Sequence, residues 1–267
     1  MTEYIGHESA FQRDIPVVIF CGGKGTRLKE ETEFKPKPMV TIGGRPILWH
    51  IMKIYAHYGY TKFILCLGYK GAGIKEYFLQ RKLLTSDFVM KHGEVTECHA
   101  EGADRDWEVT FADTGEDTMT GERLLRVQKY ISRDTFMVTY GDGVSNINIP
   151  ELVAFHETKN MIGTITGVHP TSKYGLVATD GEQRVISFDQ KPRLHDFVNG
   201  GFMVFKKDFF RYLRPGQMIE EALVALAAER QLALYPHEDF WHCMDTYKDY
   251  EDLNHLWREN PRWKIWA

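Results

Sequence analysis

The stretch Val17–Pro38 reads VVIFCGGKGTRLKEETEFKPKP and decides how the rest of the chain can fold. Its first four residues are β-branched or aromatic and predict a short buried strand that stops at Gly22 and Gly23. Glycines permit a tight turn, and because they lack a Cβ atom a phosphate can approach the backbone amides. Basic residues that include Lys24, Arg27, Lys35 and Lys37 follow within sixteen positions of Gly22. This pattern is typical of a turn that binds a polyphosphate.

Other glycine-rich turns differ from this one in their spacing. A Walker A loop requires G-x-x-x-x-G-K-[ST], which GGKGTRL does not contain. A dinucleotide fingerprint requires G-x-G-x-x-G, and Leu28 stands where the third glycine would be. From the glycines alone, a surface turn with solvated charges remains open. Arg27, a fixed-charge fork suited to phosphate oxygens, and Lys37, held between two prolines, favour the phosphate site.

The segments that follow alternate between helical and strand patterns. Ile47–Tyr58 has one apolar helical face, Lys62–Leu67 is a buried strand, and Gly73–Leu83 is a second amphipathic helix. Further helices are predicted at 121–130, 150–159, 219–230 and 247–259, and further strands at 135–139, 161–168, 201–205, 232–235 and around Trp241. This order predicts an α/β fold with a doubly wound, mostly parallel mixed sheet of the Rossmann-like type. Ligands of such sheets bind at the carboxyl ends of the strands, where the glycine turn lies.

Two segments predict antiparallel pairs outside this pattern. From Phe88 to Asp113 the stretches FVMKHG, EVTECHA and WEVTFAD alternate between apolar and polar residues, which predicts a small antiparallel β insertion at about 86–115. Strands at 176–179 and 185–188 flank Asp180-Gly181, which predicts a hairpin. We expect residues 1–14 to be an N-terminal extension and residues 15–267 to form a single domain.

The composition limits the possible partners. A formal net charge of −4 argues against a nucleic-acid partner. The N-terminus lacks a signal-peptide pattern, and no apolar run approaches the roughly 20 residues that span a bilayer. The four cysteines are far apart and form no C-x-x-C pair, which suits a reducing compartment. We therefore expect a cytoplasmic protein that binds neither membranes nor nucleic acids, with Cys21 and Cys66 buried in strands.

Several motifs resemble those of the sugar-phosphate nucleotidylyltransferases. They are GGKGTRL at 22–28, KPKPMV at 35–40, GGRPIL at 43–48, TYGDGV at 139–144 and NGGF at 199–202. Two further segments, MTGERL at 119–124 and MDT at 244–246, are similar to the cytidylyl branch of that family. The resemblance extends from about Pro16 to Trp266. It implies transfer of a nucleotidyl group from CTP to a sugar 1-phosphate with Mg²⁺ as cofactor, by a homo-oligomer such as a hexamer.

The resemblance also implies roles for individual residues. Asp142 and Asp245 would hold the metal ion, and Arg27, Lys37 and Asp142 would be catalytic. The implied nucleotide-binding residues are Phe20, Cys21, Gly22, Gly23, Lys24, Gly25, Thr26, Arg27, Lys37, Thr118, Arg123 and Gly141. The implied sugar-phosphate residues are Gln190, Lys191, Asn199 and Gly200. Without the resemblance, Asp142 in its G-D-G context could equally be a turn aspartate, and His237 and His242 are expected to be structural or solvated.

One position departs from the family pattern. The family usually reads E-K-P, whereas this chain reads Gln190-Lys191-Pro192. Glutamine keeps an acceptor oxygen but loses the negative charge. The acceptor could therefore be a phosphate other than glucose 1-phosphate, and UTP or dTTP could replace CTP. A Rossmann dehydrogenase and a catalytically idle nucleotide sensor are alternatives from other classes; the missing third glycine disfavours the first, and the intact charged residues disfavour the second.

Overall fold

The computed structural model describes residues 14–84, 86–92, 94–99 and 106–266. Of the predicted N-terminal extension, only Asp14 lies within these ranges, and it pairs with Lys62 and Arg133. No helix among the described residues is both long enough and apolar enough to cross a membrane.

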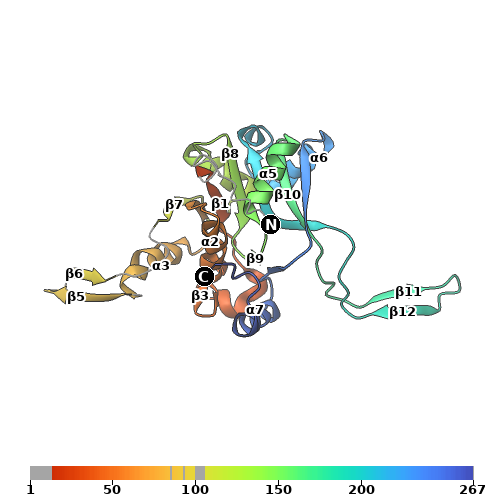
Figure 1. The fold of residues 1–267 in the computed structure, drawn as a ribbon, viewed down its shortest axis with the longest axis horizontal. Helices are drawn as coiled ribbons and strands as arrows, with labels where there is room; N and C mark the ends of the chain where they lie inside the picture. Colours follow the sequence, from red (N-terminus) through yellow and green to blue (C-terminus); the bar gives the residue numbers. More distant parts are fainter. Residues whose placement is uncertain (1–13, 85, 93, 100–105, 267) are drawn as a thin grey trace, which may run out of the picture.

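A seven-stranded sheet forms the centre of the molecule (Figure 1). In spatial order its strands are β14 (Leu232–His237), β10 (Gly163–Val168), β13 (Val198–Lys206), β8 (Thr135–Tyr140), β1 (Val17–Phe20), β4 (Lys62–Leu67) and β7 (Glu108–Asp113). Strand β1 runs parallel to both of its neighbours, and only β13 is antiparallel to the strands beside it. The predicted mostly parallel mixed sheet is confirmed.

Helices cover both faces of this sheet, so its inner strands are apolar on both sides. In β1, Val17 and Ile19 belong to one hydrophobic cluster, while Val18 and Phe20 belong to the other. The principal helices are α2 (Ile47–His57), α3 (Gly71–Leu84), α4 (Thr120–Val127), α5 (Ile149–Lys159), α6 (Ile219–Ala228) and α7 (Tyr247–Glu259). The predicted helices therefore exist; their ends agree within two residues except that α4 ends at Val127, where a 3₁₀ turn at Gln128–Tyr130 continues the predicted segment.

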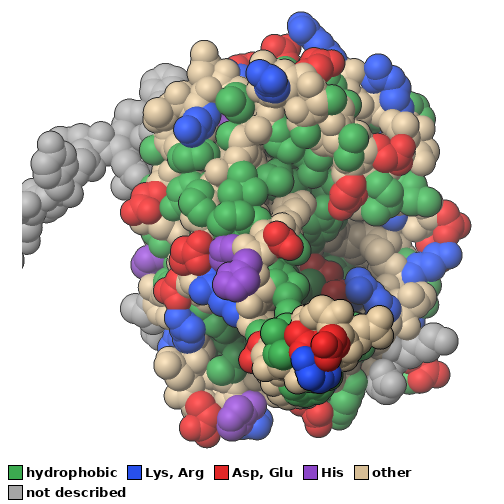
Figure 2. Space-filling view, turned by 90° about the vertical axis from the view of Figure 1, so that its right-hand side faces the viewer, with side chains coloured by type: hydrophobic (Ala, Val, Ile, Leu, Met, Phe, Trp, Pro, Cys, Tyr) green, Lys and Arg blue, Asp and Glu red, His purple; other side chains and the backbone are tan. Residues whose placement is uncertain are grey.

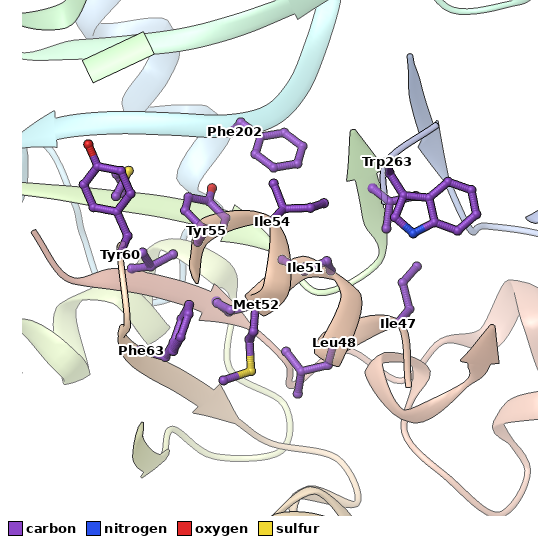
Figure 3. Packing of buried hydrophobic residues seen from close by; sticks show 14 of the residues in the cluster. Ile47, Leu48, Ile51, Met52, Ile54, Tyr55, Tyr60, Phe63, Phe202 and Trp263 are labelled. Atoms are coloured by element: carbon purple, nitrogen blue, oxygen red, sulfur yellow. The ribbon is translucent and has the colours of Figure 1, made fainter. Parts of the chain in front are cut away.

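Helix α2 is the centre of the first cluster (Figure 3). Its Ile51, Ile54 and Tyr55 side chains are fully buried and pack with Phe202 from β13 and Trp263 from the C-terminal segment. Pro46 directly precedes its first residue, at the start of the helix, where proline is favoured. Because Trp263 comes from the end of the chain, this core joins the N-terminal half of the domain to its C-terminus.

Short elements complete the fold around the sheet. They are α1 (Lys29–Thr32), the pair β2 (Thr41–Ile42) and β3 (Arg45–Pro46), the pair β9 (Gly143–Ser145) and β15 (Trp241–Cys243), and 3₁₀ turns at Thr26–Leu28, Lys37–Met39, Gln128–Tyr130 and Lys207–Arg211. The β9–β15 pair matters most for function, because it joins the segment after β8 to the segment before α7.

Two antiparallel hairpins extend from the body on opposite sides in Figure 1. One is formed by β5 (Asp87–Lys91) and β6 (Glu94–His99), the other by β11 (Leu176–Thr179) and β12 (Val185–Asp189). Both were predicted. The prediction was wrong for the third stretch of the insertion, WEVTFAD. This stretch contains β7, which pairs in parallel with β4 as an edge strand of the main sheet. Its alternating pattern reflects an edge position and cannot distinguish parallel from antiparallel pairing.

The buried histidines and cysteines have structural settings. His50 is neutral because burial lowers its pKa to about 4, and its ring contacts Ile42 O and Trp263 Nε1. His237 contacts Ser145 Oγ and Phe240 O, in agreement with the structural role expected. Cys21 and Cys66 are free and buried, and burial raises the pKa of Cys66 to about 12. These groups pack and do not react.

Candidate functional site

The candidate site lies where the central strands β1 and β8 end. Phe20 and Tyr140 are register partners at the ends of these parallel strands, so the segments that follow them leave the sheet at the same edge. Gly141 N donates to Phe20 O at 3.1 Å. A Cβ atom on Gly141 would lie 2.7 Å from the same oxygen, so only glycine fits there. This close approach brings Asp142 beside the glycine turn.

A cavity of about 260 Å³ opens between these segments. Its lining residues are Phe20, Gly23, Gly25, Thr26, Arg27, Lys37, Pro38, Thr120, Tyr140, Gly141, Asp142 and Asp245. Most of the residues predicted to be catalytic, metal-binding or nucleotide-binding are among them. The face that carries the β11–β12 hairpin is visibly hollowed behind it, with acidic and basic side chains in and around the hollow (Figure 2).

Two cations and two carboxylates meet in this cavity. Lys37 Nζ lies 2.7 Å from Asp142 Oδ2 and 2.7 Å from Asp245 Oδ1. Arg27 forms a bidentate pair with Asp245, at 2.8 Å and 3.1 Å. The Lys37 side chain is only 12% exposed; burial opposes its charge, but Asp142 and Asp245 outweigh burial and raise the pKa of Lys37. Lys37 is therefore a structured, permanently charged group.

The position of Asp245 depends on residues far along the chain. Pairing of β15 with β9 aligns the two segments, and Met244 N donates to Asp142 O at 2.8 Å. Asp249, in the first turn of α7, accepts hydrogen bonds from Asp245 N at 3.1 Å and Thr246 N at 2.7 Å. Burial would raise the pKa of Asp249, but these and other hydrogen bonds hold it well below its usual range. Asp249 is therefore a charged cap that fixes the start of α7 beside Asp245.

The carboxylates suit a hard divalent cation. Ligand atoms of Asp142, Asp245 and Cys243 lie within 4.8 Å of one another. Because Lys37 Nζ contacts both carboxylates at 2.7 Å, both already converge on one cation position. Mg²⁺ prefers such oxygen ligands. Burial raises the pKa of the Cys243 thiol far above its usual range, and a protonated thiol is a poor ligand for Mg²⁺. The residues that fit Mg²⁺ are therefore the two aspartates.

The glycine turn is open at only some of its positions. A Cβ atom on Gly23 would have no neighbour within 4 Å, and Gly25 has a φ of +63°, which favours glycine. Lys24 points away from the main cavity and pairs with Asp117 at 2.6 Å. It lines a neighbouring hollow of about 450 Å³ together with Thr26, Tyr69 and others. Cys21 packs in the hydrophobic core.

Neither Thr118 nor Arg123 lines the cavity. Arg123 is 3% exposed, and its guanidinium donates to Gly22 O, Leu67 O and other uncharged acceptors. Thr118 lies beside Gly115, where its Oγ1 would be 2.6 Å from an added Cβ atom. The structure thus places Arg123 against the Gly22 carbonyl and Thr118 beside Gly115, and neither residue among those that line the cavity.

A larger cavity of about 630 Å³ lies between the base of the β11–β12 hairpin and the start of α7. Its lining residues are His169, Pro170, Thr171, Ser172, Lys173, Lys191, Trp241, His242, Cys243, Asp245, Thr246, Lys248, Asp249 and Asp252. Asp245 lines both cavities, so they meet at the proposed metal ligand. Of the four predicted sugar-phosphate residues, Lys191 alone lines this cavity.

The other three sugar-phosphate residues are placed elsewhere. Asn199 Oδ1 accepts from Gly201 N at 3.0 Å, and Gly200 O accepts from Trp241 Nε1 at 2.7 Å. Gln190 lies beside Gly175, with its Oε1 3.1 Å from the position of an added Cβ atom. Asn199 and Gly200 thus make contacts within the protein, and none of the three residues lines the larger cavity.

Some lining residues were not predicted. Tyr140 donates to a Glu220 carboxylate oxygen at 2.5 Å, and its ring lies 5.8 Å from that of Phe20. Tyr140 and Pro38 both belong to motifs read in the sequence, so their proximity to the site could have been inferred from the neighbouring residues. Lys173 and Lys248 carry no comparable signal, because single lysines in polar segments are common on surfaces.

These features suit a protein that binds a polyphosphate between cations and paired carboxylates. Comparison with known proteins agrees. Residues 16–260 match the family model described as "Nucleotidyl transferase". The chain belongs to this family of nucleotidyl-transferring enzymes.

Two proteins named as glucose-1-phosphate cytidylyltransferases are similar to this chain over almost their whole length. The chain is 44% identical to the "Probable glucose-1-phosphate cytidylyltransferase" of Bacillus subtilis (strain 168), over 93% of this chain and 99% of that protein. It is 42% identical to the "Glucose-1-phosphate cytidylyltransferase" of Salmonella typhi, over 93% and 98%. Among solved structures, HddC from Yersinia pseudotuberculosis has the same fold, with a TM-score of 0.66 and 22% identity over 91% of this chain and 99% of that one.

Proposed function

We propose that this protein transfers a cytidylyl group from CTP to glucose 1-phosphate, which yields CDP-glucose and pyrophosphate. The observation that carries the proposal is the convergence of Arg27, Lys37, Asp142 and Asp245 at the end of β1, beside the open glycine turn. The relatives named as glucose-1-phosphate cytidylyltransferases, which this chain matches over almost their whole length, support the choice of substrates.

The reaction exchanges one phosphoanhydride bond for another. An oxygen of the sugar phosphate attacks the α-phosphorus of CTP, and the bond from that phosphorus to the β-phosphate oxygen breaks as pyrophosphate leaves. The attacking phosphate is already ionised near neutral pH, so the protein needs no general base. It must instead bring two polyanions together and stabilise the charge of the transferring group.

The chain's own residues meet these requirements. Arg27 and Lys37 supply fixed positive charge to the triphosphate, and they exchange their carboxylate partners for phosphate oxygens as the nucleotide binds. Backbone amides at Gly23 and Gly25, with the Thr26 hydroxyl, bind phosphate oxygens on the open side of the turn. The remaining predicted nucleotide residues are of two kinds: Phe20 and Gly141 line the cavity, whereas Cys21, Gly22, Lys24, Thr118 and Arg123 do not.

Asp142 and Asp245 would hold Mg²⁺. A bound Mg²⁺ neutralises phosphate charge and orients the α-phosphate. Asp142 thereby serves both the metal and Lys37, which is why we count it with the catalytic residues. On the acceptor side, we assign Lys191 to the sugar phosphate, since its positive charge lies in the larger cavity that meets the metal site at Asp245.

Two features of the chain are compatible with more than one phosphate acceptor. Gln190 replaces the glutamate usual in the family, and the larger cavity brings Lys173, Lys191 and Lys248 together. An acceptor phosphate other than glucose 1-phosphate is therefore the second candidate, with the same chemistry. Use of UTP or dTTP in place of CTP is a further variant that the same assay tests.

The proposal extends to the organisation of the protein. We assign residues 15–267 to one domain, since both hydrophobic clusters pack on one sheet. We also propose a homo-oligomer, with a hexamer as the expected form. In support, the β11–β12 hairpin exposes Val185, Ile186 and Phe188, and an isolated two-stranded hairpin is at best marginally stable in water. The use of CTP would place the enzyme in the cytoplasm.

Pyrophosphate release in the presence of Mg²⁺ tests the function. CTP, UTP, dTTP and ATP are each combined with a panel of phosphate acceptors that includes glucose 1-phosphate. Release with CTP and glucose 1-phosphate alone is the expected result. Release with CTP and another acceptor would replace the acceptor and keep the mechanism, whereas no release with any pair would overturn the proposal in favour of an idle nucleotide sensor.

A further inference from the structure

Arg123, which the resemblance assigns to the nucleotide, contacts protein atoms throughout its guanidinium. It lies in α4, and its side chain reaches the ends of three neighbouring strands, β1, β4 and β7. Each of these strands is followed by a segment that bends away from the sheet edge at the site. A single buried side chain therefore touches all three segments.

The contacts are numerous and short. One terminal nitrogen, Nη2, lies 3.2 Å from Gly22 O and 3.0 Å from Glu116 O. The other, Nη1, lies 3.1 Å from Leu67 O, 2.8 Å from Thr114 Oγ1 and 2.7 Å from Gly115 O. These acceptors are four backbone carbonyls and one hydroxyl, so the planar fork is held in a fixed place by uncharged groups of the described residues.

Two glycines leave space for the guanidinium. A Cβ atom on Gly22 would lie 2.2 Å from Arg123 Nη1, and one on Gly68 would lie 2.5 Å from the same atom. Distances this short require the side chain to move. Gly22 was expected to be a glycine because a phosphate must reach its amide; in the structure, Arg123 itself requires the missing Cβ. The glycines at 22 and 68 and the arginine at 123 thus form one packed unit.

We propose that Arg123 is a positioning residue for the nucleotide site, which acts by clamping the Gly22 carbonyl to the ends of β4 and β7. The clamp sets the direction in which residues 23–27 leave β1, and so the placement of the amides and of Arg27 around the polyphosphate. That a nucleoside triphosphate is the ligand rests on the proposed function.

The clamp depends on shape as well as charge. A lysine at 123 keeps the positive charge but has one compact ammonium group in place of a planar fork, so it cannot reach five acceptors in three segments. Carbonyl groups left without a donor in a buried place are costly, and the segments that carry them are expected to open more often. Arg123→Lys therefore separates the fork geometry from the charge.

The first test needs no nucleotide. Amide hydrogen exchange is measured on the full-length protein for the wild type and for Arg123→Lys. We expect exchange to rise about tenfold in residues 22–28, 67–69 and 114–117, with the β1 core unchanged. Arg126→Lys is the matched control: Arg126 lies on the same helix, is half exposed, and contacts Thr114 O but neither of the other segments. Equal exchange in Arg123→Lys and wild type, or a uniform rise across the chain, would overturn the clamp.

The second test separates positioning from direct contact with the groups that distinguish cytosine from uracil and thymine, its N3 atom and exocyclic amine. Dissociation constants of CTP, UTP and dTTP are measured for both proteins. Because the clamp acts on the phosphate turn, we expect Arg123→Lys to weaken all three by a similar factor of about ten, with the KM of the acceptor unchanged. Weakening of CTP alone would make Arg123 a base contact and overturn the proposal. A wild type that binds no nucleoside triphosphate would overturn the proposed function, while the exchange test would still decide the clamp.

Gly68→Ala tests the clamp at a glycine that leaves space for the guanidinium, without changing Arg123. Its added methyl group displaces the guanidinium, so we expect the same three segments to exchange faster and the double variant with Arg123→Lys to show no further change. Gly73→Ala is the matched control, since a Cβ atom there would have no neighbour closer than 3.9 Å. Additive effects of Gly68→Ala and Arg123→Lys would show that the two residues act separately and would contradict the proposal.

Discussion

The cavity at the ends of β1 and β8 and the cavity at the base of the β11–β12 hairpin meet at Asp245 but are built differently. The first has a volume of about 260 Å³, and its walls are turns that directly follow buried strands. The second has a volume of about 630 Å³, and its walls come from the hairpin base, from β15 and from the start of α7. Residues of the first are fixed by the sheet, whereas the second combines residues fixed by β15 and the start of α7, such as Asp245 and Asp249, with the lysines Lys173, Lys191 and Lys248.

This difference suggests how one fold serves several substrates. The groups proposed to bind the polyphosphate are fixed to the core through Gly141, Arg123 and the β9–β15 pair. The groups proposed to meet the acceptor are side chains on a hairpin that leaves the body. We therefore expect substitutions in the first cavity to abolish the chemistry and substitutions in the second to change only which acceptor is used.

Asp142→Asn should have the largest effect. It removes the charge that pairs with Lys37 and would hold Mg²⁺, so we expect turnover to fall by about 10³-fold. The assay is pyrophosphate release at saturating CTP, with the melting temperature measured in parallel to show that the protein is folded. Asp117→Asn, whose carboxylate pairs with Lys24 outside the main cavity, is the control. Near-normal turnover of Asp142→Asn would remove Asp142 from the catalytic residues.

Lys37→Ala should rank second. Loss of one fixed cation from the first cavity is expected to lower turnover by about 10²-fold. Lys35→Ala is the matched control, because Lys35 lies two residues earlier and pairs with Glu31 at 3.1 Å. If both variants lost the same small amount of activity, Lys37 would be an ordinary surface charge and the contrast between the two cavities would fail.

Lys191→Ala tests the second cavity. Removal of one charge-assisted contact to the acceptor phosphate should raise the KM of the acceptor about tenfold and leave the KM of CTP unchanged. Arg184→Ala changes a charge on the same hairpin at its Asp180 end and should leave both constants unchanged. A rise in the KM of CTP would show that the two cavities do not divide the substrates as proposed.

Gln190→Glu should have the smallest effect. Because Gln190 lies beside Gly175 and lines neither cavity, we expect kcat/KM for glucose 1-phosphate to change by less than about threefold, even though the charge is restored. A large gain with glucose 1-phosphate would place position 190 against the sugar and make its glutamine the mark of a different natural acceptor.

Local patterns predicted most of the fold. Four apolar residues before Gly22 predicted β1, and the alternation of strands and helices predicted a parallel sheet with ligands at its carboxyl edge. The same local reasoning failed for β7, because an alternating pattern reports which face is buried and not the direction of the neighbouring strand. It also could not place Gln190 and Asn199, since their surroundings depend on how the β11–β12 hairpin leaves the sheet.

The sequence by itself determined the strands, the glycine turn and the presence of Arg27, Lys37 and Asp142 near one strand edge, because each depends on residues close together in the chain. Tertiary structure decided which distant groups meet there. Asp245 reaches Lys37 through the β9–β15 pair, across about 200 residues. Arg123 became a clamp because α4 packs against the ends of three strands. Contacts of this kind follow from the packing of the core, and the spacing of residues along the chain does not predict them.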